Sequence, residues 1–325
     1  MRAESRKVSV GMAALTPDAS SPASTRAIAA AGLDHVVCGD HVSFIVGAGF
    51  DGLIGATHEL ASERSLRAFV AVYLLPLRHP VLVARQLSSM SERYPGRLTF
   101  GVGVGGEDPH ELEICGIDPR TRGRRMDESL SVLRALLAGT PVAHHGEFFD
   151  MDDAVILPAP QPPVPIIVGG RSDIALRRAG RLADGWIGIW NSARRFEEAT
   201  AIIADTACAA GRRNVEWQHA MQVWCGIGND PAEGRASLAP AMEGMYNIPF
   251  ERFERYSPCG TPDTIAEFLA PYVSAGCRTF NLIACAAHLD TAVAGVAEIR
   301  RLLNHAPRSC DLRHTQNRLV PTARR

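Results

Sequence analysis

Short apolar runs rich in valine and isoleucine recur along the whole chain. Each run is nearly continuous in hydrophobic residues, which is typical of strands buried on both faces of a parallel sheet. We expect eight such strands, at residues 7–12, 33–38, 66–75, 97–104, 165–170, 185–190, 220–227 and 278–285.

The stretches between these runs carry the spacing of amphipathic helices. The clearest helical patterns lie at residues 80–94, 122–139, 261–276 and 289–305. The second ends at Gly139, and glycine is a frequent residue just past a helix C-terminus. The third begins with Thr261 as N-cap and Pro262 in the first turn.

Eight strands alternating with helices predict an α/β fold, the (β/α)8 TIM barrel with insertions. A doubly wound open sheet is the alternative, but it usually carries a glycine-rich fingerprint after its first strand, and GMAALTPDAS has none. We expect one barrel domain over residues 1–305. Its long irregular stretches are 39–52 and 139–164, the latter a small hairpin with a proline-rich return. Residues 306–325 are rich in arginine and are expected to form a disordered basic tail.

Composition narrows the classes of function. The formal net charge is −1, so no basic field indicates a nucleic-acid partner. The eight cysteines form no CxxC pair and no Cys/His cluster with ligand spacing, so we expect no metal site and a reducing compartment. The N-terminus has no long apolar segment, and no apolar run reaches about 18 residues. These features predict a soluble cytoplasmic protein without a membrane partner.

In a barrel of this kind the active site lies at the carboxyl ends of the strands. The sequence CGDH places Asp40 and His41 just past the second strand. A carboxylate and an imidazole there can bind a polar heterocycle or transfer a proton. The simpler interpretation is a capping aspartate and a surface histidine, and the strand-end position makes the two interpretations about equal.

Two glycine-rich turns follow the fourth and fifth strands. In FGVGVGGEDPHE, Gly105 and Gly106 are the better ligand candidates, since packing can explain the earlier glycines. In PIIVGGRSD, backbone N–H groups at a helix start, Ser172 as N-cap and Arg171 together suit a phosphate. A tight turn between a strand and a helix explains the same glycines equally well, and residue types alone leave the choice open.

Several longer stretches resemble one known family. They are LLPLRHPVLVARQLSSMSERYPGRLTFGVGVGG (74–106), RGRRMDESLSVLRALLAG (122–139), HGEFFDM (145–151), PIIVGGRSDIALRRAGRLADGWI (165–187) and GTPDTIAEFLAPYVSAG (260–276). Together they resemble the bacterial luciferase-like flavin and deazaflavin oxidoreductases, the luciferase-like monooxygenase superfamily. Within it the chain is most similar to the branch that depends on coenzyme F420. The resemblance implies the same (β/α)8 barrel.

The resemblance also implies a role for several strand ends. The cofactor phosphate would bind after the fifth strand, the deazaflavin ring would face the end of the second, and the cofactor side chain would follow the fourth. The third strand would carry a bulge behind the ring, with a non-proline cis peptide. The cofactor-binding positions implied in this way are Asp40, His41, Ala71, Val72, Gly105, Gly106, His110, Gly169, Gly170, Arg171 and Ser172. The chain departs from the family in reading FVAV, not Gly-Thr-Gly-Val, in the third strand. It also lacks the Trp that sugar-phosphate-oxidising members carry after Asp-His.

The activity implied is hydride transfer between F420 and a small organic substrate, with His41 as first candidate for proton transfer and Glu107 as second. Arg78 and Arg171 are the candidates to contact the anionic tail of F420. The alternative on the same barrel is an FMN-dependent monooxygenase, which would use O2 and reduced FMN from a partner reductase. A third interpretation is a barrel that binds flavin or F420 without turnover. Members of the family often form homodimers.

Overall fold

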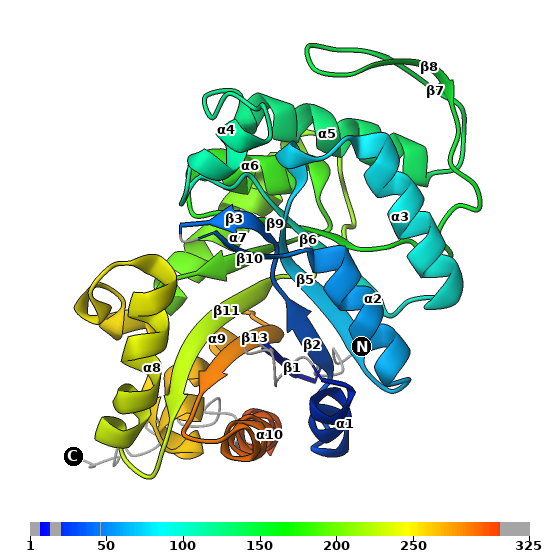
Figure 1. Ribbon diagram of the computed structural model, residues 1–325. Coiled ribbons are helices and arrows are strands. Elements are labelled where there is room, and N and C mark those ends of the chain that lie inside the picture. Colours follow the sequence, from blue (N-terminus) through cyan, green and yellow to red (C-terminus); the bar gives the residue numbers. More distant parts are fainter. Residues whose placement is uncertain (1–6, 14–20, 46, 306–325) are drawn as a thin grey trace, which may run out of the picture.

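The computed structural model describes residues 7–13, 21–45 and 47–305, and it shows a closed barrel of parallel strands (Figure 1). The strands are neighbours in the order β10-β9-β6-β5-β2-β1-β13-β11, and pairing of β10 with β11 closes the ring. They are β1 (Ser9–Ala13), β2 (His35–Cys38), β5 (Arg67–Leu74), β6 (Leu98–Gly103), β9 (Ile166–Gly169), β10 (Gly185–Ile189), β11 (Ala220–Ile227) and β13 (Thr279–Cys285). All eight predicted strands are present, and the (β/α)8 barrel is confirmed. The two-residue strand β12 (Cys259–Gly260) extends the sheet beside β11.

Helices surround the barrel. Those in the described ranges are α1 (Pro22–Ala30), α2 (Gly52–Ser62), α3 (Pro80–Arg93), α4 (His110–Ile114), α5 (Arg122–Leu137), α6 (Asp173–Leu182), α7 (Ala193–Ala209), α8 (Pro231–Tyr246), α9 (Pro262–Ser274) and α10 (Leu289–His305). The side chain of Thr261 caps α9 as predicted, and Gly139 follows α5 with a positive φ of 73°. Among the described residues no helix is both long and apolar enough to cross a membrane. The expected basic tail, 306–325, lies outside the described residues.

Two β-hairpins leave the barrel. Strands β7 (Val142–His145) and β8 (Asp150–Ala154) form the hairpin expected within 139–164, and it projects from the edge of the molecule (Figure 1). Strands β3 (His41–Phe44) and β4 (Ala48–Phe50) form a second hairpin where an irregular stretch was expected. In this second hairpin His41 lies opposite Phe50, so both rings are held beside the end of β2.

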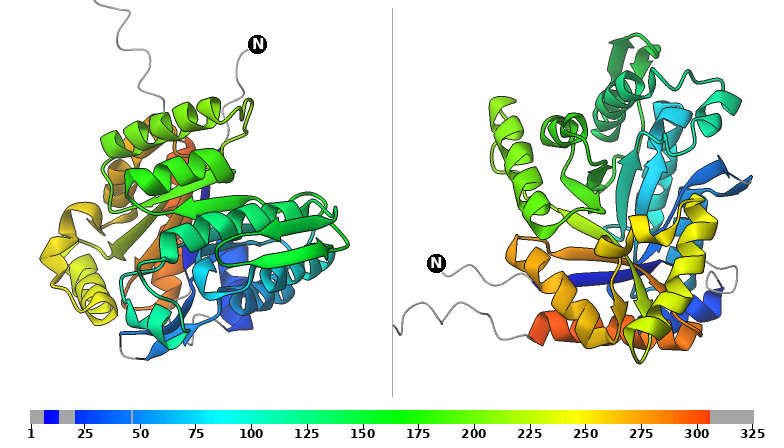
Figure 2. Two further views of the ribbon diagram at one scale, coloured as in Figure 1. Left: turned by 90° about the horizontal axis from the view of Figure 1, so that it is seen from above. Right: turned by 90° about the vertical axis from the view of Figure 1, so that its left-hand side faces the viewer.

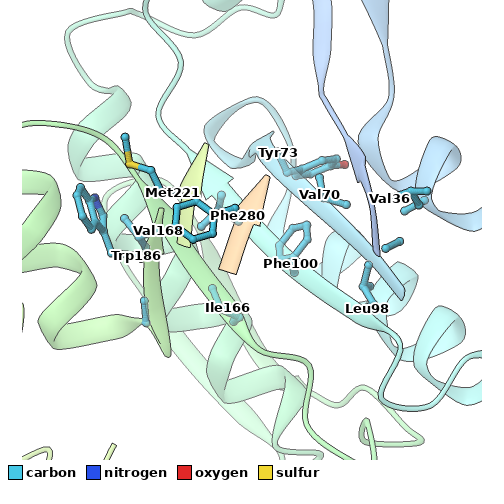
Figure 3. Packing of buried hydrophobic residues seen from close by; sticks show 14 of the residues in the cluster. Val36, Val70, Tyr73, Leu98, Phe100, Ile166, Val168, Trp186, Met221 and Phe280 are labelled. Carbon is cyan, nitrogen blue, oxygen red and sulfur yellow. The ribbon is translucent and has the colours of Figure 1, made fainter. Parts of the chain in front are cut away.

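The hydrophobic core has a large outer part and two smaller parts. The outer part packs strand residues against the surrounding helices, and Figure 3 shows Phe100, Ile166 and Phe280 within it, all 2% exposed or less. A small cluster around Phe69 fills the barrel interior. Another packs α8 and the following turns against the ends of β11 and β13, around Trp224. This last cluster positions α8 as a wall at the mouth of the barrel.

Candidate active site

A cavity of about 240 Å³ opens at the carboxyl ends of the barrel strands. The predicted site residues that line it are Asp40, His41, Ala71, Val72, Gly105, Gly106, Glu107, Gly169, Gly170 and Arg171. Two other predicted residues do not line it. The side chain of His110 is 64% exposed and lies beside Glu113, while the Ser172 hydroxyl accepts a hydrogen bond from Ala175 N as the N-cap of α6.

The turn from β9 into α6 suits an anion. Gly170 has a φ of +128°, and a Cβ placed there would lie 2.7 Å from the Cβ of Ala175, so this turn requires glycine. The first N–H groups of the ten-residue helix α6 have no intrahelical partners, and the helix dipole favours negative charge beside them. The guanidinium of Arg171 lies 5.3 Å from the Trp190 ring and forms no salt bridge within the described residues. The turn therefore offers backbone donors and an uncommitted cation to a phosphate.

Strand β5 supplies apolar residues to the cavity, among them Ala71, Val72 and Leu74. The peptide bond Ala71–Val72 is cis, and the register between β5 and β6 shifts between Val70 and Tyr73, so the bulge and the cis bond implied by the resemblance are both confirmed. The neighbouring strand makes room for this bulge, since a Cβ at Gly103 would lie 2.5 Å from a methyl group of Val72. The glycines of β6 are thus explained by packing, as one interpretation of the sequence proposed.

Asp40 lies beneath the cavity in a saturated hydrogen-bond arrangement. It accepts hydrogen bonds from Arg78 Nη1 (2.7 Å) and Nη2 (2.8 Å), from Gly52 N (3.0 Å) and from Leu74 N (2.8 Å). Burial raises the pKa of the Asp40 carboxyl, while the charge of Arg78 opposes that rise. Arg78, which the sequence suggested as a contact for an anionic tail, instead joins strand ends β2 and β5 through this buried ion pair.

His41 is paired with Glu111, a carboxylate that was not predicted from the sequence. Its Nδ1 lies 2.9 Å from Oε2 of Glu111, a residue only 3% exposed. The other oxygen of Glu111 accepts hydrogen bonds from Val42 N (2.7 Å) and Ser43 N (3.1 Å). The short helix α4 therefore holds the β3–β4 hairpin through a single carboxylate.

Glu107 stands at the mouth of the cavity with an exposed side chain. The surrounding protein nevertheless desolvates it enough to raise the pKa of its carboxyl, against the lowering effects of the positive charges of His41 and Arg171. Its neighbour Tyr246 accepts a hydrogen bond from Trp224 Nε1 at 3.2 Å, and burial raises the pKa of the Tyr246 phenol. Glu107 is the carboxyl in this cavity placed to exchange a proton with solvent.

The walls opposite the Gly169–Arg171 turn are mostly apolar. They come from β11, β13 and α8 and include Trp224, Met245, Tyr246 and Ile283. Phe44 of the β3–β4 hairpin lies 6.5 Å from the Tyr246 ring, so the hairpin and α8 approach each other across one side of the mouth (Figure 2). None of these wall residues was predicted from the sequence, because Trp224 lies inside the seventh strand and the others belong to the eighth strand and to α8.

The cavity thus combines three features that fit an elongated cofactor with a ring and a phosphate. Backbone N–H groups and Arg171 suit the phosphate, the Ala71–Val72 bulge supports a flat ring, and His41 with its carboxylate partner can move a proton. The glycine turns let a ligand approach the backbone closely.

Curated relatives include uncharacterized mycobacterial proteins that are 43% identical over 122 residues, 38% of this chain, and the chain spans 42% of their length. The F420-dependent glucose-6-phosphate dehydrogenase of Nakamurella multipartita is 33% identical over 225 residues, 62% of this chain and 66% of that protein.

Solved structures with the same fold include an F420-dependent secondary alcohol dehydrogenase in complex with an F420-acetone adduct (TM-score 0.79, 17% identity). They also include an FMN complex of the oxygenating constituent of 3,6-diketocamphane monooxygenase from Pseudomonas putida (TM-score 0.73, 18% identity). The matches cover 91% of this chain and 99% and 98% of those chains. The sequence model described as luciferase-like monooxygenase matches residues 19–256, most of the chain. The chain belongs to the luciferase-like monooxygenase family.

Proposed function

We propose that this protein is an F420-dependent oxidoreductase that transfers a hydride between the deazaflavin ring and a small organic substrate. The observation that carries the proposal is that the glycine turn at Gly169–Arg171 and the Ala71–Val72 bulge line one cavity. The name of the Nakamurella relative supports F420 over FMN. Bound F420 would supply a ring that exchanges one hydride and one proton.

The protein's own residues would orient the reactants and move the protons. The N–H groups at the start of α6 and the Arg171 guanidinium would hold the phosphate, and Val72 would support the ring from behind. In the oxidation direction His41 would accept the proton of the substrate hydroxyl while the substrate carbon gives up a hydride to the cofactor. In the reduction direction His41 would return that proton. Glu107, with its raised pKa, is the second candidate for proton exchange.

The walls favour an uncharged substrate. Among the described residues that line the cavity, Arg171 is the only arginine or lysine, and the phosphate takes it in this proposal. The opposite wall is built from Trp224, Met245, Tyr246 and Ile283, which offer apolar surface to a substrate. We therefore propose a small alcohol or carbonyl compound without a phosphate group as the substrate.

The test is a turnover assay with purified protein and F420. A panel of small alcohols and ketones would be incubated with oxidised or reduced F420, and the deazaflavin absorbance would be followed. Glucose 6-phosphate would be included as a charged comparison. The proposal expects turnover with at least one uncharged compound and less with the sugar phosphate. A parallel assay with reduced FMN and O2 tests the monooxygenase alternative, and product formed only in that assay would refute the proposal.

A further inference from the structure

We infer that Glu111 is a positioning residue for His41 that fixes the imidazole tautomer and leaves Nε2 as the proton acceptor. The catalytic consequence of this inference rests on the proposed function. The orientation and tautomer of His41 rest only on the geometry of α4 and the β3–β4 hairpin. Glu111 lines the same cavity as His41, but its printed hydrogen bonds go to His41 and to the backbone of the β3–β4 hairpin, and on that ground we assign its effect on the reaction to His41.

The hydrogen bonds around Glu111 determine which nitrogen of His41 carries the proton. Oε1 of Glu111 already accepts from two backbone donors, Val42 N and Ser43 N, and Oε2 lies 2.9 Å from His41 Nδ1. An ionised carboxylate has no hydrogen to donate, so Nδ1 must be the donor. Neutral His41 is therefore the Nδ1–H tautomer, and its Nε2 carries the free lone pair. No protein partner of Nε2 is found among the described residues.

Hydrogen bonds fix the position of the proton on His41, and packing fixes the plane of its ring. The His41 ring centroid lies 4.2 Å from that of Phe44 and 6.0 Å from that of Phe50, which meets it edge-on. The hairpin that carries these rings is tied down a second time, since Asp108 Oδ2 accepts a hydrogen bond from Ile45 N at 2.8 Å. The imidazole is thus held in one orientation at the wall of the cavity, where Nε2 can meet a substrate hydroxyl.

The negative charges near His41 also favour proton uptake at Nε2. Glu111 packs against it from α4, and Glu107 faces it from the loop after β6. Asp40, the preceding residue, is neutralised by Arg78 from the end of β5. Two carboxylates next to the ring favour the imidazolium that forms when Nε2 accepts a proton, and Glu111 is the one in direct contact.

The substitution Glu111→Gln tests this directly. The amide oxygen of glutamine can still accept from Val42 N and Ser43 N, so the hairpin stays in place. The amide nitrogen is a donor, however, and it requires Nδ1 to become the acceptor. The proton then moves to Nε2, and the lone pair that would accept the substrate proton is lost. Glu111→Asp keeps a carboxylate acceptor and serves as the conservative variant.

The first readout needs no cofactor. Nitrogen-15 NMR of the histidine side chains should show the Nδ1–H form of His41 in the wild type and in Glu111→Asp, and the Nε2–H form in Glu111→Gln. The matched control is Glu113→Gln in the same helix, where an exposed carboxylate lies beside His110 and should leave the His41 signals unchanged.

The second readout is turnover in the oxidation direction. We expect kcat to fall by about 100-fold or more in Glu111→Gln, with little change in KM for substrate, because loss of general-base catalysis typically costs 10²–10⁴-fold. Persistence of the Nδ1–H form in Glu111→Gln would overturn the inference, as would unchanged kcat in a variant whose tautomer has inverted. Failure of the wild type to bind F420 would instead refute the proposed function and would leave the NMR comparison valid.

Discussion

Replacing Arg78 with methionine should strongly destabilise the fold, because it leaves the Asp40 carboxylate buried without its counter-charge. The Asp40 side chain is fully buried and would keep only two of its four donors, Gly52 N and Leu74 N. Breaking a buried ion pair by removing one partner typically costs about 3–5 kcal/mol. For a protein of this size 1 kcal/mol corresponds to roughly 2 °C in Tm, so we expect Tm to fall by about 6–10 °C.

The stability lost in Arg78→Met should be larger at neutral pH than in acid. Burial raises the pKa of Asp40 above its unfolded value, and removing Arg78 takes away the charge that opposes this rise. A carboxyl with a raised folded pKa destabilises the protein at pH values above that pKa, and the cost disappears as pH falls through it. The difference in unfolding free energy between wild type and Arg78→Met should therefore be large at neutral pH and should shrink in acid.

Denaturant unfolding and thermal scans at several pH values measure this effect. The control is Arg301→Met, which removes an exposed ion pair with Glu298 and should cost much less stability, because solvent screens that pair. The double variant Asp40→Asn/Arg78→Met removes the buried charge and should recover part of the loss. The buried-charge reasoning fails if Arg78→Met costs no more than Arg301→Met, or if the double variant is no more stable than Arg78→Met alone.

Three further predictions concern the cofactor turn and the core. Arg171→Met should weaken F420 binding about 10- to 150-fold in a fluorescence titration, since a charged hydrogen bond is worth about 1.5–3 kcal/mol. Replacing the exposed Arg177 of α6 is the control and should leave F420 affinity unchanged. Gly170→Ala should lower both stability and F420 affinity, because its φ of +128° and the 2.7 Å approach to Ala175 exclude a side chain; unchanged values would contradict the turn geometry. Leu130 is fully buried in the outer core, so Leu130→Ala should lower the free energy of unfolding by about 2–5 kcal/mol in denaturant titrations and leave F420 affinity unchanged. A loss of affinity in the folded variant would count against a purely structural role for Leu130.

The barrel could be predicted because its strands are buried on both faces. In β2, for example, Val36 packs into the outer core while Val37 lines the cavity, so consecutive residues are both apolar. That continuous hydrophobicity is visible without any knowledge of the fold. The caps at Thr261 and Gly139 could be predicted for a similar reason, because each depends only on local backbone geometry.

The elements that were missed have weaker local patterns. Helix α8 contains Pro240 and two glycines, Gly234 and Gly244, which interrupt its helical signal. Gly234 is needed there for packing, since a Cβ on it would lie 2.4 Å from the carbonyl oxygen of Gly226 in β11. The β3–β4 hairpin exposes Val42 and Ile45, so burial does not mark its register in the sequence.

Some residues of the candidate site could likewise be predicted from the sequence, and others could not. Asp40, His41 and the Gly169–Arg171 turn could be selected because strand ends are placed by the fold alone. Glu111 could not, because it reaches His41 across 70 residues of sequence only after the hairpin folds onto α4. The role of Arg78 depends on burial beside Asp40, and an arginine in a loop carries no sequence signal for such burial.

Binding of F420 to the purified apoprotein tests the central claim most directly. The protein would be titrated with F420 and separately with oxidised FMN, with ligand fluorescence as the signal, and Arg171→Met would be titrated in parallel. The account predicts micromolar or tighter binding of F420 by the wild type, clearly weaker binding by Arg171→Met, and weaker binding of FMN than of F420. Micromolar binding of FMN with no binding of F420 would contradict it.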